Sequence, residues 1–438
     1  MLMLIILLLL IFLGVPLFAV IGLSAIWGFL QQDVDLIVIA IEIYRLVDMP
    51  VLIAVPLFTF AGYVLGESNA AARLVKLSDA LLGRLPGGLP IVAIITCALL
   101  TAFTGASGVT IVALGALLYP ALRQAGYKER FSLGLLTSSG SLGLLFAPSL
   151  PLILYGVVAQ QVSQEIPVNI DDLFIAGILP GLLMLIVLSV YSMFVSRELP
   201  LATFTVDAGK PTVSRSRQIT SALKEAIWEL PLPFVVLGGI YGGYFAISEA
   251  AAITAMYVFV VEVFIRREVS WRNLPLIIKD SMMLVGAILV ILGASLASTN
   301  YLIDAGVPQQ IFEIIHKHID DKWTFLIALN IFLLVLGMML DIFSAIVIMI
   351  PIILPVALGY GVHPVHLGII FLANMQIGYF TPPVGMNLFI ASYRFNKPIL
   401  TLCYAAIPFF LLLMLCVLII TYWPALSLGL LDTPVVAP

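Results

Sequence analysis

The sequence GYFTPPVGMN (residues 378–387) interrupts a long apolar run with two glycines and two prolines. A similar stretch, GLLFAPSLPL (143–152), lies 235 residues earlier, and the same shift places Pro148 on Pro383. Backbone groups cannot stay unpaired against lipid, so a broken helix at membrane depth must be buried in protein or line a cavity. Matched breaks in two halves of a chain are the pattern expected of a transporter binding site.

The composition is that of a polytopic membrane protein. Of the 438 residues, 62% are hydrophobic and 10% are charged, whereas soluble domains carry about 25% charged residues. Basic residues are few and scattered, which argues against a nucleic-acid partner. The three cysteines lie in apolar segments and predict neither a disulfide framework nor a transition-metal site. We therefore expect an all-α protein with helices of about 20 apolar residues.

Two segments are predicted to be re-entrant helical hairpins. Residues 88–120 carry TGASG (104–108) at their centre, where strong helix formers are scarce. Each flank of about 15 residues reaches only ~22 Å as a helix, which is less than a hydrocarbon core of about 30 Å. The shifted counterpart is 323–355, with LDIFS (340–344) at its tip.

Loop charges predict that the two hairpins enter from opposite faces of the membrane. Lysines and arginines flank the first hairpin on both sides, which indicates that both of its ends are cytoplasmic. The acidic segment 161–172 is expected outside, and the basic segment 197–227 inside. The N-terminus is then cytoplasmic and the C-terminus lies outside. The second hairpin enters from outside, which makes an inverted-topology repeat.

The predicted organisation has five regions. They are a first transmembrane helix with an interfacial segment (1–48), a first repeat (49–196) with a broken helix over 131–160, a cytoplasmic link with scaffold helices (197–279), a second repeat (280–424) with a broken helix over 366–393, and a C-terminal tail (425–438).

One motif also suggests an enzyme. GASG within TGASG resembles the nucleophile motif of intramembrane rhomboid proteases, in which a serine pairs with a histidine on another helix. The four histidines here lie in or beside predicted outside loops, whereas Ser107 belongs to a hairpin that enters from inside. This placement disfavours the protease, and we expect no enzymatic activity.

Longer stretches resemble a transporter family. The strings TGASGVTIVALGALLYPAL, AGYKERFSLGLLTSSGSLGLLFAPSLPLILYG and PIILPVALGYGVHPVHLGIIFLANMQIGYFTPPVGMNLFIAS are similar to the large membrane subunit of tripartite ATP-independent periplasmic (TRAP) transporters. Together with DDLFIAGILPGL they extend the likeness over nearly the whole chain. Two positions depart from the family pattern, since Ala147 stands where a second proline is expected and His363 where an aspartate is expected.

The resemblance implies uptake of an organic acid across the bacterial inner membrane, driven by a sodium gradient. It also implies a periplasmic substrate-binding protein, a small four-helix membrane subunit on a separate polypeptide, and an elevator motion of a transport domain against a scaffold. A stand-alone sodium/dicarboxylate carrier with the same repeat plan is the alternative. Dicarboxylates, sugar acids and other carboxylates all remain open as substrates.

Oxygen-bearing residues at the tips and breaks are the candidate sodium ligands. Small residues that let helices pack closely are an alternative role for TGASG, and a helix cap is an alternative role for Asp341. We expect one ion at Thr104, Gly105, Ser107, Ser138 and Gly143, and a second at Asp341, Ser344, Gly378, Thr381 and Asn387. The expected substrate-binding residues are Ser139, Ser141, Pro148, Pro382, Pro383 and Gly385. Roles for Asp304 and Arg394 are left open.

Overall fold

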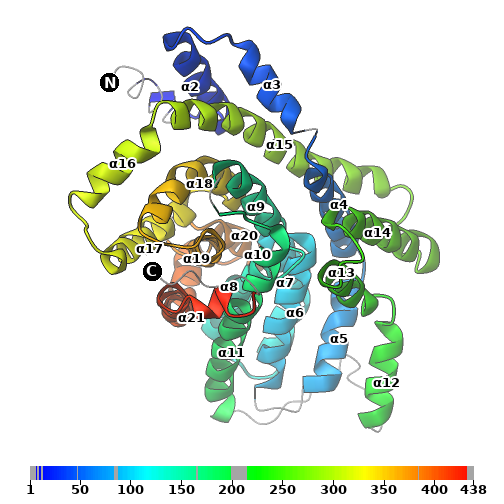
Figure 1. Ribbon diagram of the computed structural model, residues 1–438. Coiled ribbons are helices and arrows are strands. Elements are labelled where there is room, and N and C mark those ends of the chain that lie inside the picture. The colour runs from blue at the N-terminus through cyan, green and yellow to red at the C-terminus, as the bar shows by residue number, and fades with distance from the viewer. Residues whose placement is uncertain are drawn as a thin grey trace.

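Helices make up the regular structure of the described residues (Figure 1). The computed structural model describes residues 6–431 except 7–8, 11–12, 47, 83–86, 164–165, 199–214 and 383. Within this part, seven helices are long and apolar enough to cross a membrane, or eight when one bent pair counts as a span. This confirms the prediction of an all-α polytopic membrane protein. The predictions for 1–48, 197–279 and 425–438 lie partly outside the described residues.

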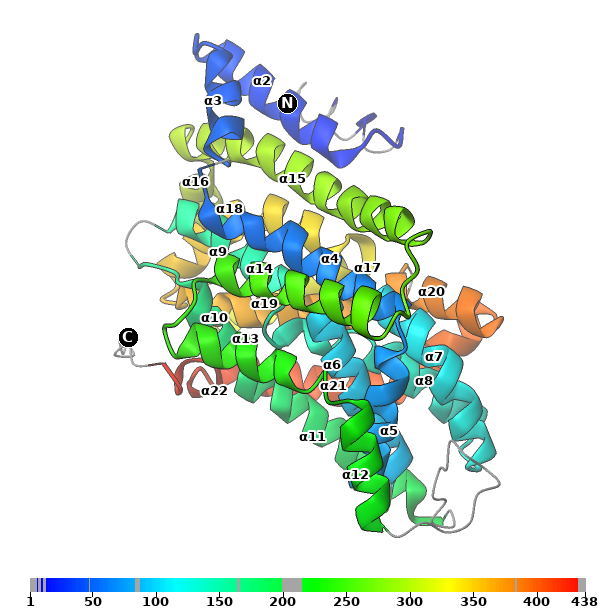
Figure 2. The ribbon, with the colours of Figure 1, turned by 90° about the vertical axis from the view of Figure 1, so that its right-hand side faces the viewer.

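An outer group of helices contains the longest one, α15 (Figure 2). The helix α15 packs against α2, α3 and α4, and α4 also packs against α14. A 3-10 turn, η1, leads into α4, and a π-helical turn, η4, extends α14. The bounds of this group are α2 Leu17–Gln31, α3 Ile37–Arg45, η1 Pro50–Ile53, α4 Ala54–Glu67, α5 Ala70–Leu82, α12 Arg215–Glu225, α13 Pro231–Tyr241, α14 Ile247–Phe259, η4 Val260–Ile265, α15 Leu274–Asp304 and α16 Val307–His316.

The remaining helices form an inner group that holds both predicted hairpins and both breaks. Here α8 packs against α21, α17 against α19, and α18 against α9. The bounds are α6 Gly88–Thr104, α7 Ser107–Gln124, α8 Glu129–Ser139, η2 Leu142–Leu145, α9 Leu150–Val162, α10 Ile170–Ala176, α11 Ile178–Val195, η3 Ser196–Glu198, α17 Lys322–Met339, α18 Ile342–Gly359, α19 Pro364–Gly378, α20 Met386–Phe395, α21 Ile399–Tyr422 and α22 Ala425–Leu428.

The helix bounds repeat at the offset of 235 residues. Adding 235 to both ends of α7 gives both ends of α18, and adding it to the first residue of α8 gives the first residue of α19. The last residues of α6 and α17 are also 235 apart. The two halves therefore have the same order of helices from the first hairpin arm to the break, without insertion or deletion.

The hairpin arms are longer than the sequence suggested. The helices α6 and α7 have 17 and 18 residues, and α17 and α18 have 18 each. At 1.5 Å per residue the arms measure ~25–27 Å, so the estimate of about 15 residues per flank was wrong. Thr104 and Ser107 of the TGASG motif are themselves helical, which leaves two non-helical residues at the tip. In addition, α7 continues through Pro120 to Gln124, and α18 continues through Pro355 to Gly359.

Both predicted breaks interrupt helices. The first separates α8 and η2 from α9, with a bend of 43° between the two parts. The second separates α19 from α20. Both breaks contain proline, which lacks a backbone N–H and kinks or breaks a helix interior. Proline alone does not end a helix here, because α7, α18 and α21 each continue through at least one.

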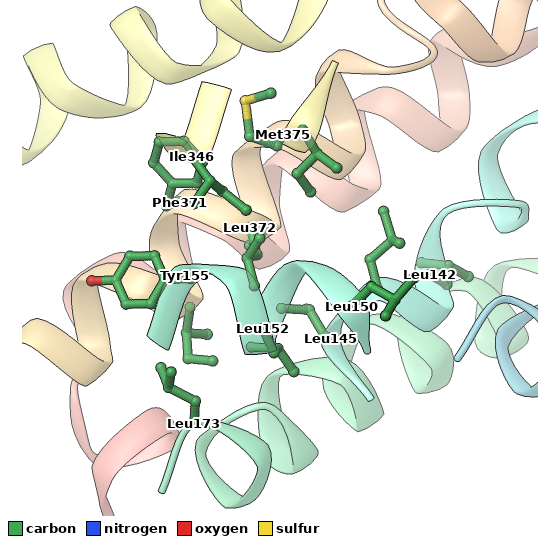
Figure 3. Packing of buried hydrophobic residues seen from close by; sticks show 14 of the residues in the cluster. Leu142, Leu145, Leu150, Leu152, Tyr155, Leu173, Ile346, Phe371, Leu372 and Met375 are labelled. Carbon is green, nitrogen blue, oxygen red and sulfur yellow. The ribbon is translucent and has the colours of Figure 1, made fainter. Parts of the chain in front are cut away.

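The first break packs directly against α19 (Figure 3). Leu145 and Leu152 belong to the same buried cluster as Phe371 and Leu372. Every residue of α19 is buried. Tyr155 Oη donates a hydrogen bond of 2.6 Å to the carbonyl oxygen of Pro364, where α19 begins. The break of one repeat is thus held against the central helix of the other.

Candidate functional site

The first hairpin tip rests on the beginning of α9. Gly105 adopts a left-handed backbone with φ of 64°, which glycine adopts without a steric penalty. A Cβ atom at Gly105 would lie 2.6 Å from Leu150 Cδ1, so a side chain has no room there. Thr104 is fully buried beside this turn. The tip and the first break are therefore in direct contact, as the sequence predicted.

The same tip also contacts the second repeat. Ser107 Oγ donates a hydrogen bond of 2.8 Å to Asn387 Oδ1 at the beginning of α20. Asn387 Nδ2 in turn donates to the carbonyl oxygen of Thr137 at 3.4 Å. From the sequence, Asn387 was expected at the second tip, but its side chain joins Ser107 and α8 of the first repeat. Both side chains are buried.

Two threonines connect the arms of the first hairpin to the end of α8. The hydroxyl oxygens of Thr101 and Thr110 are 2.6 Å apart, and Thr101 Oγ1 donates to the carbonyl oxygen of Gly140 at 2.8 Å. All three residues are buried. Neither threonine is among the candidate ligands chosen from the sequence. The available signal was the spacing of Thr101 and Thr110, which lie within one or two helical turns of the TGASG tip.

The serines before the first break face different partners. Ser138 and Ser139 donate to carbonyl oxygens of their own helix, Gly134 O at 2.8 Å and Leu135 O at 2.7 Å respectively. Ser141 Oγ instead donates to the carbonyl oxygen of Gln376 on α19 at 2.9 Å. Only Ser141 of these three therefore links the two repeats through its side chain.

Gly143 allows the first break to approach the backbone of α6. A Cβ atom at Gly143 would lie 2.2 Å from the carbonyl oxygen of Ala98. Gly378 has the same role in the second repeat, where a Cβ atom would lie 2.5 Å from the carbonyl carbon of Gly337 on α17. Gly143 and Gly378, two of the three glycines predicted as ion-site residues, thus permit close backbone contact between each break and its own hairpin arm.

Asp341 caps the second hairpin tip. Its Oδ1 accepts hydrogen bonds of 3.0 Å from the backbone N–H groups of Phe343 and Ser344. The backbone N–H of Ile342 donates to Tyr379 Oη at 2.7 Å, so the second tip contacts the second break. Asp341 is half-buried and Ser344 is buried. The other carboxylate oxygen of Asp341, Oδ2, takes no part in these two hydrogen bonds.

Two hydrogen bonds within the second break involve Thr381 and Asn387. Thr381 Oγ1 donates to the carbonyl oxygen of Ile377 at 2.7 Å, and Asn387 N donates to the carbonyl oxygen of Tyr379 at 2.8 Å. Gly385 is buried and Pro382 is exposed. Pro383 lies outside the described residues. In the first break, Pro148 is buried.

The central helix α19 carries two amides that the sequence interpretation missed. Asn374 Nδ2 donates to Asn330 Oδ1 at 2.7 Å, and Gln376 Nε2 lies 2.6 Å from Met184 Sδ. The oxygens Asn374 Oδ1 and Gln376 Oε1 are buried without a hydrogen-bond partner among the described residues. In the sequence, these two amide side chains within a largely apolar segment were the signal that could have identified them as candidate polar groups of the site.

The tips and breaks together form a site rich in neutral oxygens and helix ends. The helices α7, α9, α18 and α20 begin there, and α6, α17 and α19 end there. Helix beginnings offer free N–H groups to anions, and helix ends offer carbonyl oxygens to cations. Within the described residues, no group of three His, Cys, Asp or Glu side chains could hold a metal ion. The donor set consists of hydroxyl, amide and carbonyl oxygens with one carboxylate, Asp341.

The arrangement does not fit a serine protease. The hydrogen bond of Ser107 goes to an amide oxygen. His366, the buried histidine, lies within hydrogen-bond distance of Ser427 Oγ and of the carbonyl oxygen of Thr421 instead. Among the described residues, no histidine is hydrogen-bonded to Ser107.

Comparison with known proteins gives full-length matches. The family model "Tripartite ATP-independent periplasmic transporter, DctM component" matches residues 4–426. The C4-dicarboxylate TRAP transporter large permease protein DctM of Rhodobacter capsulatus is 32% identical over 427 residues, which are 95% of each chain. The protein of the same name from Pseudomonas aeruginosa is 33% identical, over 90% of this chain and 88% of that protein. The isethionate TRAP transporter permease protein DctMQ of Oleidesulfovibrio alaskensis is 34% identical, over 95% of this chain and 64% of that protein.

Two solved structures share the fold. The YdaH transporter of Alcanivorax borkumensis superposes with a TM-score of 0.58 at 15% identity, over 85% of each chain. MtrF of Neisseria gonorrhoeae gives a TM-score of 0.53 at 12% identity, over 85% of this chain and 80% of that one. At these identities the likeness concerns the fold alone.

Proposed function

Since the chain belongs to the DctM family of TRAP transporter large permeases, we propose that it moves a small organic acid across the bacterial inner membrane together with sodium ions. The observation that carries this proposal is the hydrogen bond between Ser107 and Asn387. It joins the first hairpin tip to the second broken helix, so that helix ends from both repeats meet at one place. Secondary transporters with repeats bind substrate and coupling ions at such junctions.

Sodium fits the donors of this junction. A hard monovalent cation suits hydroxyl, amide and carbonyl oxygens, whereas soft transition metals prefer thiolate or imidazole ligands. The first site would use Thr104, Ser107 and Ser138 with carbonyl oxygens near Gly105 and Gly143. The second would use Asp341, Ser344 and Thr381 with carbonyl oxygens near Gly378. Asn387 would serve the first site, because its side chain contacts Ser107.

The substrate is proposed to be a small anion or zwitterion. Relatives of this chain are named for C4-dicarboxylates, isethionate and ectoine. An acidic group would be favoured at the beginnings of α7, α9 and α20, where free N–H groups and the helix dipoles attract negative charge. Ser139, Ser141 and the prolines of the two breaks would line the substrate.

The partners are proposed to be a small membrane subunit and a periplasmic substrate-binding protein. The isethionate relative bears the name DctMQ, and this chain spans only 64% of its length, which supports a second membrane component. In this arrangement the N-terminus is cytoplasmic and the C-terminus periplasmic. The inner helix group would move as an elevator against the outer group that contains α4, α14 and α15.

Transport by the reconstituted complex tests this function. The permease, its small subunit and its binding protein would be placed in proteoliposomes with radiolabelled succinate, isethionate or ectoine. We expect uptake of one of these solutes under an inward sodium gradient and none under a matched choline gradient. Uptake of equal rate in choline would contradict sodium coupling. Uptake by the permease without either partner would instead support the stand-alone carrier.

A further inference from the structure

Tyr379, the first residue after α19, reaches from the second break to the second hairpin tip. Its Oη accepts a hydrogen bond of 2.7 Å from the backbone N–H of Ile342, the first residue of α18. Tyr379 is 3% exposed. Its N–H donates to the carbonyl oxygen of Met375 at 3.1 Å, and its carbonyl oxygen accepts from Asn387 N at 2.8 Å. The phenol is therefore held at the second tip by the end of α19 and the beginning of α20.

The first three backbone N–H groups of α18 all have acceptors. Asp341 Oδ1 accepts from Phe343 N and Ser344 N. Tyr379 Oη accepts the remaining one, from Ile342 N. N–H groups at a helix beginning have no partner within the helix, so they need an outside acceptor where they are buried. Two oxygens thus serve three donors, and Tyr379 supplies the acceptor for the donor that Asp341 Oδ1 does not reach.

The other carboxylate oxygen of Asp341, Oδ2, is left for a ligand. Among the described residues it has no hydrogen-bond partner, yet it is not one of the fully buried polar atoms without a partner. Asp341 is half-buried, so Oδ2 keeps surface that a small ion can reach. Hard cations take oxygen ligands of this kind. The second tip therefore offers an ion a charged oxygen that the helix itself does not use.

The first repeat lacks both side-chain groups. At the offset of 235 residues, Asp341 corresponds to Ala106 and Tyr379 corresponds to Leu144. Ala106 makes no side-chain cap for α7, and the side chain of Leu144 has no oxygen to offer the first tip. The tyrosine hydroxyl thus accompanies the carboxylate at the tip that carries one. This pairing indicates a role that the two groups share at the second tip.

We propose that Tyr379 is a positioning residue for the second ion site, an inference that rests on the sodium coupling proposed above. By accepting the N–H of Ile342, Tyr379 Oη leaves Asp341 Oδ2 available to the ion. Without the hydroxyl, the unpaired N–H competes with the ion for that oxygen, because a buried donor without a partner costs more than a hydrogen bond contributes. Asp341 binds the ion, and Tyr379 acts on the ion only through the beginning of α18.

Sodium-dependent thermal stabilisation of the purified permease in nanodiscs measures ion binding without transport, with choline as the inert cation. Tyr379→Phe removes only the hydroxyl, and we expect the sodium concentration for half-maximal stabilisation to rise about 5-fold or more. Uptake by the reconstituted complex at saturating sodium should stay close to that of the wild type.

Tyr155→Phe is the matched control. It also removes a buried tyrosine hydroxyl that is hydrogen-bonded at a helix beginning, the carbonyl oxygen of Pro364, but it does not touch the second tip. We expect its half-maximal sodium concentration to equal that of the wild type. Equal weakening in Tyr155→Phe and Tyr379→Phe would contradict a positioning role, because any lost buried hydroxyl would then have the same effect.

Ile342→Pro removes the donor itself. Proline is favoured at the first position of a helix, where its missing N–H has no intrahelical partner to lose. In the Ile342→Pro background, Tyr379→Phe should leave the sodium response unchanged, since no N–H remains to compete for Asp341 Oδ2. This comparison also carries the test if Tyr379→Phe alone is unstable. A weaker sodium response in the double variant than in Ile342→Pro would refute the proposal.

The wild type separates the two levels of the argument. If it responds to sodium and Tyr379→Phe responds at the same concentration, the role of Tyr379 is overturned and the sodium coupling stands. If the wild type gives no response to sodium, the proposed coupling is contradicted, and the role of Tyr379 falls with it.

Discussion

Ser107 Oγ and Asn387 Oδ1 are 2.8 Å apart and hydrogen-bonded, although 280 residues separate them in the chain. The bond crosses from the first hairpin of one repeat to the broken helix of the other. Ser141, which donates to the carbonyl oxygen of Gln376, makes a second crossing of this kind. Each repeat therefore supplies polar groups to the broken region of the other.

The Ser107–Asn387 bond predicts energetic coupling between the two residues. Ser107→Ala leaves the buried Asn387 oxygen without its donor, which costs ~1–3 kcal/mol. Asn387→Ala removes a partner of both Ser107 and Thr137 and should cost at least as much. We expect the double variant to be less destabilised than the sum of the singles, by more than ~0.5 kcal/mol. Thermal unfolding in nanodiscs measures this cycle, and strictly additive effects would contradict the bond.

Gly143→Ala is predicted to destabilise the protein, because the new methyl group would meet the carbonyl oxygen of Ala98 at 2.2 Å. The backbone would have to move, at a cost of ~1–3 kcal/mol. Gly378→Ala should have a similar effect, through contact with Gly337. We expect a lower melting temperature and a loss of transport in both variants.

Gly286→Ala is the control for these two variants. Gly286 lies in α15, and a Cβ atom there would meet nothing within 4 Å. Alanine has a higher helix propensity than glycine, so this variant should be as stable as the wild type or slightly more stable. If all three variants had the same melting temperature, close packing at the breaks would not be a constraint.

Asp341 can be tested separately as a helix cap and as an ion ligand. Asp341→Asn keeps an oxygen that can accept from Phe343 N and Ser344 N, and asparagine is as good an N-cap as aspartate. We expect nearly unchanged stability but at least 10-fold weaker sodium activation of uptake. Asp341→Ala should lose both properties and cost ~1 kcal/mol in addition. Wild-type sodium dependence in Asp341→Asn would remove Asp341 from the second ion site.

Asp79 on α5 predicts a dependence of stability on pH. Burial raises the pKa of Asp79 to about 6, above the usual value near 3.9. The folded protein therefore takes up a proton at higher pH than the unfolded chain does. The contribution of Asp79 to the unfolding free energy rises as pH falls from about 6 to about 4, and its charge destabilises the fold above pH 6 by ~1–2 kcal/mol.

Asp79→Asn should accordingly be more stable than the wild type at pH 7.5, and the difference should shrink towards pH 4. Melting temperatures measured across this range check the prediction. A constant difference between the two proteins at all pH values would show that the pKa of Asp79 is not raised.

The sequence alone was sufficient to locate the breaks and the first hairpin tip, where glycine and proline act locally. Both breaks contain the glycines and prolines that the sequence pointed to, and the first tip turns at Gly105 with a left-handed backbone. The 235-residue shift was visible in these positions, and the helix bounds repeat at the same offset.

The partners of individual side chains depended instead on packing between segments that are distant in the sequence. Asn387 was expected at the second tip because it is near it in sequence, but the turn after Tyr379 carries it to Ser107. Arg73 was interpreted only as a cytoplasmic loop charge, since its partners Glu229, Glu262 and Glu268 lie 156 or more residues away. No local pattern could have joined them.

The shared helix bounds of the two hairpins have an electrostatic consequence. At the offset of 235, Ala106 corresponds to Asp341, and Leu152 corresponds to Asn387. The two tips share their helix bounds but differ in backbone, since Gly105 is left-handed and Leu340 is extended. They also differ in charge, with a carboxylate at one and only neutral dipoles at the other. A cation arriving at the first tip would keep its full positive charge, while one at the second would be neutralised. Two sodium ions at the proposed positions would therefore bind with unequal affinity, and together they would leave one net positive charge beside an acidic substrate.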